Sequence, residues 1–392
     1  MIKIYVNRFI KTSKTKSFED STLNLITTVI KKEYPKLNAN ILLPVVFASV
    51  TESTVTMSIK KLKKKNFIVK SNRTILEYLS KIESNTVELI AIKIRTILFK
   101  IARRYGFFKR RVVVSIDFHD KPFYGKKDTF GTVGTKRKLG TNFAYSYITI
   151  CICEEGIRFN LATIPVTKQK LKKTLIERLI TEARKHVSIG LILLDRAFNG
   201  VETSRLIDDK HAYYVMPLID NKKIARVCKT TRKLVVLPYI YYENRSKEYR
   251  KEIRVIVDNR NNKNHLFTTN IKGNNRALLS TIIYIYRKRW GIETGYRVSG
   301  NFYAWTTSVK FNTRTFLGLL SFLMQDFWVL YNFILRKGNK KQQPRKTLLK
   351  KCKSIVRFLK KSAQDIRFYW RPEYEVELFK EDIADCIKKK LT

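Results

Sequence analysis

The stretch Arg110–Gly125, RRVVVSIDFHDKPFYG, decides the fold of this chain. Its segment Val112–Ile116 is rich in β-branched residues, which favour a pleated backbone that is covered on both faces. Such a run is typical of a central strand in an α/β sheet. The run leads to one carboxylate, that of Asp117, and then to a polar segment. We therefore expect Asp117 to stand at the end of a strand, where a turn begins.

The same pattern recurs at Leu191–Asp195, where LILLD is followed by the turn-forming residues RAFNG. Two strands of one sheet would then bring Asp117 and Asp195 to the edge where open α/β sheets bind ligands. A single aspartate at a strand end is more often a turn or cap residue than a ligand. The repetition of the pattern is what indicates a functional site.

The segment Gly125–Gly140, which we expect to be a loop, combines several glycines with the cations Lys126, Lys127, Lys136 and Arg137. A flexible backbone with cations beside a carboxylate edge suits a substrate that carries phosphate. We expect these four side chains to contact such a substrate.

The hydrophobic periodicity predicts further strands and helices around the two key strands. In chain order these are strands at Asn142–Glu154 and Gly156–Val166, helices at Lys168–Lys185 and Val201–Lys210, and a strand at Ala212–Leu218. The resulting order, βββαβαβ, is that of an α/β fold with a ribonuclease-H-like mixed sheet flanked by helices. We assign residues 106–336 to this domain.

Three strand-like segments, KLVVLPYIYYE, EIRVIVDN and HLFTTNI, lie between charged turns at about residues 220–272. They predict a β-rich insertion. We expect it to stand apart from the main sheet, because the helical pattern resumes only at about Ala277.

The charge of the chain indicates a polyanionic partner. Lys and Arg number 80 against 32 Asp and Glu, which gives a formal net charge of +48. So large an excess repels itself unless it meets a polyanion such as DNA or RNA. A ribosomal or chromosome-coating protein would show similar charge, but with 44% hydrophobic residues this chain also buries a substantial core, unlike a basic tail.

The first 105 residues read as a helical lobe that we expect to bind DNA, and residues 337–392 read as a basic helical region. Within the lobe, Ser71–Arg104 shows the spacing of two amphipathic helices divided near Ser84. The run KKLKKK at Lys60–Lys65 is either a solvated helix face or a contact with the DNA backbone.

The five cysteines show no metal-ligand spacing, which favours reduced thiols in an intracellular protein, with Cys151 and Cys153 packed in a strand. The others are Cys228, Cys352 and Cys386. No signal segment is visible at the N-terminus. Residues 316–335 are apolar and about long enough to span a membrane, but Gln325, Asp326 and Asn332 interrupt them, which favours a helix buried in the protein.

A third acidic residue lies in YIYRKRWGIETGYR, part of a stretch from Leu278 to Arg297 that we predict to be one helix. Spacings of three, four and four residues place Tyr286, Arg289, Glu293 and Arg297 on one helix face. A helical glutamate near arginine is usually a surface ion pair. Here, however, the Glu293 carboxylate can join the two strand-end aspartates.

Three carboxylates brought together repel one another, and divalent metal relieves that repulsion. Oxygen ligands with open positions suit Mg²⁺ or Mn²⁺. Two such ions, roughly 3.5–4 Å apart, activate a nucleophile for in-line attack on a phosphodiester and stabilise the leaving oxygen. We therefore predict a two-metal site at Asp117, Asp195 and Glu293.

Three motifs make the chain similar to transposases of the DDE class. They are IDFHDKPFYG from Ile116, LLDRAFNG from Leu193, and the helix spacing Tyr-x₂-Arg-x₃-Glu at Tyr286, Arg289 and Glu293. The similarity runs over about residues 70–335 and is to the cut-and-paste insertion-sequence group of bacteria and archaea, nearest to an archaeal branch. It implies a ribonuclease-H-like fold with a β insertion before the final glutamate, and metal binding by the three acidic residues.

The helix of that family usually carries a lysine seven residues after the glutamate, where this chain has Gly300. We expect Arg297 to take over its phosphate contact, and Tyr286 and Arg289 on the same helix face to position phosphates as well. Trp290 either stacks on a displaced base or packs in the core. His119 is expected to make a local hydrogen bond or to touch the scissile phosphate, and Asp120 to form a turn or to serve as a reserve carboxylate.

The resemblance and the residues together predict a Mg²⁺-dependent transposase. It would bind double-stranded DNA at the inverted repeats of its element, cut there, and join the 3′ ends to target DNA. We expect a homodimer assembled on DNA, no membrane partner, and a cytoplasmic, nucleoid-associated location in a prokaryote. The alternatives are a structure-selective metal-dependent nuclease and a non-catalytic DNA-binding protein derived from a transposase.

Overall fold

A computed structural model describes most of the chain between residues 28 and 338. The gaps are 52, 65, 108–110, 139, 155–157, 169–170, 219–233, 243–249 and 260–264. Cys228, Cys352, Cys386 and the expected C-terminal region from residue 339 onward lie outside the described residues.

The chain forms two compact units. One, called the sheet unit here, comprises Arg110–Pro122 and Val133–Tyr296; the other, the helical unit, comprises Met1–Lys109, Phe123–Thr132 and Arg297–Thr392. This division differs from the boundaries expected from sequence, because the chain leaves the sheet unit after Pro122 and again after Tyr296.

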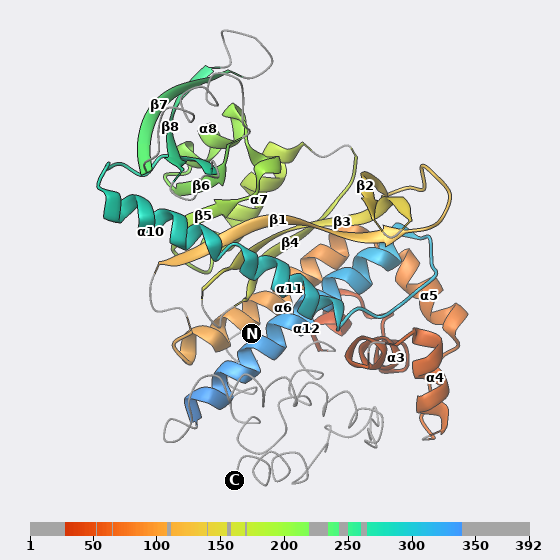
Figure 1. The fold of residues 1–392 in the computed structure, drawn as a ribbon. Helices are drawn as coiled ribbons and strands as arrows, with labels where there is room; N and C mark the ends of the chain where they lie inside the picture. The colour runs from red at the N-terminus through yellow and green to blue at the C-terminus, as the bar shows by residue number, and fades with distance from the viewer. Residues whose placement is uncertain are drawn as a thin grey trace. The chain divides into compact units, whose positions relative to one another are not determined.

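Within the described residues, nine strands form one sheet in the order β2-β3-β1-β5-β6-β9-β8-β7, with β4 also paired to β3 (Figure 1). The strands are β1 (Val112–Phe123), β2 (Val133–Lys138), β3 (Thr141–Ile152), β4 (Asn160–Val166), β5 (Ile189–Leu194), β6 (Tyr213–Pro217), β7 (Leu234–Tyr242), β8 (Arg250–Asp258) and β9 (His265–Thr269). The core order β4-β3-β1-β5-β6 confirms the ribonuclease-H-like sheet.

The directions of these strands also match that fold. β1 runs parallel to β5 and β5 parallel to β6, whereas β3 and β4 are antiparallel. Helix α8 (Val201–Asp209) connects β5 to the parallel β6, and α7 (Lys172–Arg184) leads from β4 to β5. Crossovers of this kind are what parallel neighbours require.

The predicted insertion exists as strands β7, β8 and β9, but the expectation that it stands apart from the main sheet is wrong. β9 pairs antiparallel with β6, and β8 and β7 follow it outward. The pairing supplies partners for the backbone groups along the free side of β6, which an edge strand would otherwise expose. The insertion therefore widens the sheet.

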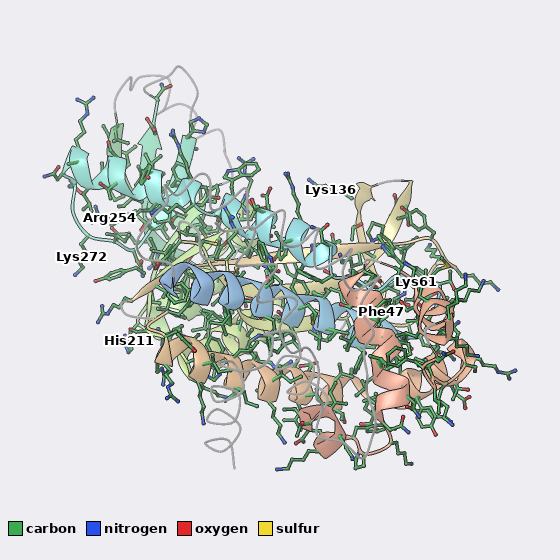
Figure 2. The ribbon with its side chains drawn as sticks, turned by 90° about the horizontal axis from the view of Figure 1, so that it is seen from below. Phe47, Lys61, Lys136, His211, Arg254 and Lys272 are labelled. Atoms are coloured by element: carbon green, nitrogen blue, oxygen red, sulfur yellow. The ribbon has the colours of Figure 1, made fainter. Side chains whose placement is uncertain are left out.

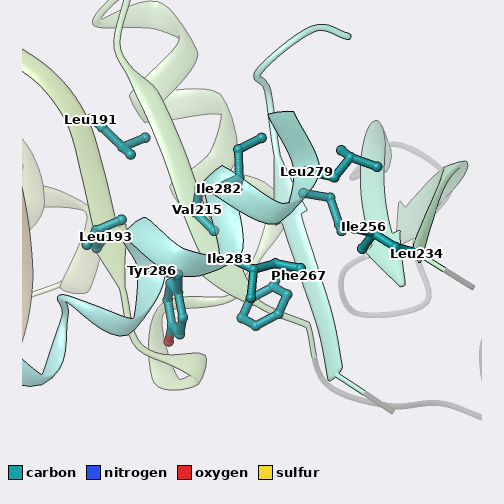
Figure 3. Close-up of a cluster of buried hydrophobic side chains, with 10 residues drawn as sticks. All are labelled: Leu191, Leu193, Val215, Leu234, Ile256, Phe267, Leu279, Ile282, Ile283 and Tyr286. Atoms are coloured by element: carbon teal, nitrogen blue, oxygen red, sulfur yellow. The ribbon is translucent and has the colours of Figure 1, made fainter. Parts of the chain in front are cut away.

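The helix α10 (Arg276–Arg287) covers one face of this widened sheet. Its residues Leu279, Ile282, Ile283 and Tyr286 pack against strand residues that include Phe267, as Figure 3 shows. The spacing of three and four residues along α10 matches an apolar helix stripe.

Two further expectations need correction. The stretch expected to be one helix from Leu278 to Arg297 is broken, and α11 (Trp290–Gly300) is a separate helix. The glycine-containing segment Gly125–Gly140 is not all loop, since β2 occupies its second half. The hairpin of β2 with β3 satisfies backbone groups that a loop would leave to solvent.

In the helical unit, α12 (Phe311–Gly338) is the central helix and packs on α3 (Ala39–Val50), α5 (Asn72–Lys81) and α6 (Ser84–Arg104). Asp326, which interrupts its apolar run, is fully buried and pairs with Arg95 of α6 at 3.3 Å (Nε–Oδ2). This confirms that the run is a helix buried in the protein. No helix in the described ranges has the length and apolarity that a membrane span needs.

Candidate functional site

Asp117 and Asp195 lie side by side on neighbouring strands. The parallel pairing of β1 and β5 ends at the register Ile116–Leu194, so each aspartate is the next residue along its strand. The sheet register itself therefore brings the two carboxylates together, as the sequence predicted.

The backbone continues differently after the two aspartates. Asp195 caps a short 3₁₀ helix, its Oδ1 accepting from the Arg196 amide at 2.7 Å, as a turn residue would. Asp117 does not enter a turn, because β1 runs on to Phe123 next to β3. Its Oδ1 accepts from the Phe118 amide at 2.8 Å, and the Phe118 ring stacks on Phe198 with centroids 5.1 Å apart.

Glu293 comes from the first turn of α11, just after the break between the two helices. At the break, the amides of Lys288 and Arg289 donate to the carbonyls of Ile285 and Tyr286, three residues back. These tight bonds close α10, and Trp290 then begins α11. The break places Arg289 at the corner between the two helices.

The Arg289 side chain lies among all three carboxylates. Its Nη1 is 3.3 Å from Asp117 Oδ2, and its Nη2 is 3.2 Å from Glu293 Oε1 and 4.0 Å from Asp195 Oδ1. The arginine side chain is 8% exposed, against 17%, 33% and 42% for Asp117, Glu293 and Asp195. The structure thus gathers the three predicted acidic residues around one cation.

The electrostatics of this cluster show why a cation is needed there. Burial raises the pKa of Asp117 to about 6, although the neighbouring Arg289 lowers it. For Arg289, burial acts against the charged form, but Tyr286 and the three carboxylates leave the pKa of the guanidinium raised. Repulsion from Asp195 and Glu293 adds to the rise at Asp117. The acidic cluster is costly to ionise without compensating charge.

The donor set suits a divalent metal, while its arrangement around Arg289 does not itself form a metal cage. Carboxylate oxygens from three residues are the ligands that Mg²⁺ and Mn²⁺ prefer. Within the described part of the chain, no group of three or more His, Cys, Asp or Glu residues lies close enough to hold a metal ion. Binding of a metal by these three carboxylates would therefore require the side chains of Arg289 and of the acidic residues to rearrange.

Two tyrosine hydroxyls connect the broken helix to the acidic strands. Tyr286 donates to the Leu194 carbonyl at 3.2 Å, and Tyr296 donates to the Asp117 carbonyl at 2.8 Å. Tyr286 is 9% exposed and packs in the core beneath α10, which favours an anchoring role over the direct phosphate contact expected from sequence. Sequence reasoning missed Tyr296, although its position three residues after Glu293 places it one helical turn away.

Three other residues named in the sequence analysis, Trp290, His119 and Asp120, differ in their surroundings. Trp290 is 61% exposed, which excludes core packing, and the Arg289 guanidinium lies 5.6 Å from its ring centre. His119 stacks on Tyr296 with ring centres 4.4 Å apart. Asp120 is not in a turn; it lies in β1 and accepts a hydrogen bond from Ser146 at 2.7 Å.

The predicted cations lie in both units. Lys136 is exposed on β2, where Figure 2 labels it, and Arg137 is its neighbour on the same strand. Lys126, Lys127 and Arg297 are exposed and belong to the helical unit. Of the lysine run, Lys60, Lys63 and Lys64 are exposed on α4 (Val55–Lys64), while Leu62 is buried. Contact of these residues with a phosphate-bearing substrate stays a prediction.

The thiols Cys151 and Cys153 are buried at the end of β3, 0% and 2% exposed. Cys151 Sγ donates to the Ile152 carbonyl, and Cys153 Sγ donates to the Cys151 carbonyl. The packing interpretation of these two cysteines is therefore confirmed.

Comparison with known proteins places this geometry in a family. No curated protein matches the chain. One similar solved structure is described as the piggyBac transposase synaptic complex with hairpin DNA, at 13% identity and a TM-score of 0.47, covering 86% of this chain and 74% of that one. The family model described as the transposase DDE domain matches residues 111–324, which is more than half of the chain and includes all three acidic residues. The chain therefore belongs to the DDE-domain transposase family.

Proposed function

We propose that this transposase binds double-stranded DNA at the terminal inverted repeats of its element, cuts the ends by metal-dependent hydrolysis, and transfers the 3′ ends into target DNA. The observation that carries the proposal is the convergence of Asp117, Asp195 and Glu293 on one guanidinium. Family membership and the net charge of +48 support a DNA substrate.

In this proposal the carboxylates of Asp117, Asp195 and Glu293 hold two Mg²⁺ or Mn²⁺ ions, which supply an activated nucleophile and charge for the leaving oxygen. Side chains of the protein would make the contacts with the DNA phosphates. The planar guanidinium of Arg289 suits a bidentate contact with a phosphate. Arg297, Lys126, Lys127, Lys136 and Arg137 are the candidates for further backbone contacts.

The exposed Trp290 offers an aromatic face to an unstacked base near the cut. Because both ends of an element must be handled together, a homodimer assembled on DNA is the expected working form. The helical lobe within residues 1–105 would supply most of the end recognition. A cytoplasmic, nucleoid-associated location follows from the substrate in a prokaryotic host.

The test is a cleavage and joining assay with Mg²⁺ on DNA that carries the sequence flanking the reading frame. Wild type is expected to nick at the repeat boundary and to form joined products, and Asp195→Asn and Glu293→Gln are expected to do neither. Cleavage without joining would instead identify a structure-selective nuclease. Salt-sensitive binding with no cleavage by any of the proteins would identify a non-catalytic DNA-binding protein.

A further inference from the structure

The two tyrosine bonds described above end on neighbouring strands, at residues one position apart in the register of β1 and β5. Tyr286 donates to the carbonyl of Leu194, the residue before Asp195, and Tyr296 donates to the carbonyl of Asp117 itself. Each bond therefore joins a helix to the strand that carries one of the two aspartates. The Thr149 hydroxyl, 2.6 Å from the Tyr296 oxygen, completes the bonding of Tyr296 as a donor from β3.

Both phenols are buried and keep their protons. Burial raises the pKa of Tyr286 to about 12 and raises the pKa of Tyr296 well above its ordinary value; the Asp117 charge adds to the effect at Tyr296. A neutral phenol is the form that can donate to a carbonyl. Loss of either hydroxyl would leave a buried carbonyl with one hydrogen bond fewer.

The helix break makes both bonds necessary. Tyr286 holds α10 and Tyr296 holds α11, while Arg289 and Glu293 lie between them at the corner and in the first turn of α11. A continuous helix would need one anchor to fix its position. Across a break, an anchor on α10 does not fix the direction of α11, so each helix requires its own.

We propose that Tyr286 and Tyr296 are paired positioning residues, which fix Glu293 and Arg289 relative to Asp117 and Asp195 through hydrogen bonds to the two aspartate-bearing strands. The catalytic consequence of this pairing rests on the proposed function. The anchoring itself does not, and it is measured separately below.

The variants are Tyr296→Phe and Tyr286→Phe, each of which removes one hydroxyl and keeps the ring. The matched control is Tyr214→Phe, because Tyr214 is a buried tyrosine of β6 in the same sheet unit, 1% exposed, whose ring lies near Lys251. Hydrogen exchange of the amides of residues 290–296 reports on anchoring. Calorimetry with Mn²⁺ in the absence of DNA reports on the carboxylates, and single-turnover cleavage reports on the reaction.

Tyr296→Phe is expected to speed exchange in α11, to weaken Mn²⁺ binding severalfold, and to slow cleavage by tenfold to a hundredfold, since displacement of a catalytic group by about 1 Å has that effect. Higher Mn²⁺ is expected to restore part of the rate, and affinity for DNA ends is expected to stay within twofold. Tyr286→Phe is expected to affect cleavage similarly, and Tyr214→Phe to affect none of these properties.

Unchanged exchange in α11 with wild-type Mn²⁺ affinity would overturn the inference, as would equal losses in Tyr214→Phe. If wild type itself neither binds Mn²⁺ nor cleaves, the proposed function is wrong. The exchange measurement then still decides whether the tyrosines anchor the helices.

Discussion

Replacement of Asp117 by Asn should stabilise the metal-free protein at neutral pH. The Asp117 side chain is 17% exposed, and burial is the largest cause of its raised pKa, about 6 against an ordinary 3.8. Asparagine resembles the protonated carboxyl in size and polarity but carries no proton that titrates. The variant therefore removes the cost of ionising this group in the folded protein.

The direction of this change in stability with pH follows from proton linkage. Between pH 3.8 and 6 the folded protein binds more protons at Asp117 than the unfolded chain does, so the free energy of unfolding falls as the pH rises through that window. The rise in the pKa of Asp117 from 3.8 to about 6 corresponds to a total change of about 3 kcal/mol in the free energy of unfolding. About 2 kcal/mol of this loss in the free energy of unfolding should occur between about pH 4.5 and 7. The rest has already occurred at about pH 4.5, because ionisation of Asp117 in the unfolded chain begins at lower pH.

The assay is urea unfolding of both proteins at a series of pH values, in a chelator and at constant ionic strength. The quantity compared is the difference between the two free energies of unfolding, which cancels the other titrating groups. This difference should move by about 2 kcal/mol in favour of Asp117→Asn as the pH rises from about 4.5 to 7. A difference that stays flat, or moves toward wild type, would refute the reasoning.

Three further outcomes are expected. Arg289→Met should lower stability at pH 7 by about 1–3 kcal/mol, less than for a fully buried pair because Glu293 is a third exposed, and added Mg²⁺ should restore part of the loss in calorimetry. Arg95→Met should cost about 3–5 kcal/mol by removing the cation that pairs with the buried Asp326 carboxylate, and a second change, Asp326→Leu, should recover most of that loss in the same unfolding assay. Trp290→Ala should change stability by less than about 0.5 kcal/mol, since the ring is exposed, but should weaken binding of single-stranded ends by about 1–3 kcal/mol in a fluorescence titration.

The two aspartates were predictable from sequence because their signal is local. Each follows a run of apolar strand residues, and strand register then places equivalent residues side by side. Glu293 was found through its spacing from Arg289 on a helix. The local pattern did not predict the path of the backbone after Asp117, because β1 continues to Phe123 beside its sheet neighbour β3.

The helix break and the extension of the sheet also could not be predicted from local sequence patterns. Residues 278–297 have helical periodicity throughout, but Tyr286 and Tyr296 bond to different strands, and two bonds to separate strands favour two helix directions. The strands at 234–269 were recognised individually. Their attachment to the main sheet depends on the otherwise unpaired edge of β6. That edge cannot be identified from the residues of these three strands alone.

The alternation of the chain between its two compact units affects how the protein can fold during synthesis. All of the sheet unit, up to Tyr296, is made before α12. The helices α3, α5 and α6 are made before the sheet unit, yet α12, on which they pack, is made after it. The parts of these helices that α12 covers, and the Arg95 guanidinium that pairs with Asp326, therefore stay without α12 while more than two hundred residues are added. During synthesis, these N-terminal helices therefore expose apolar surface that favours aggregation until α12 is made.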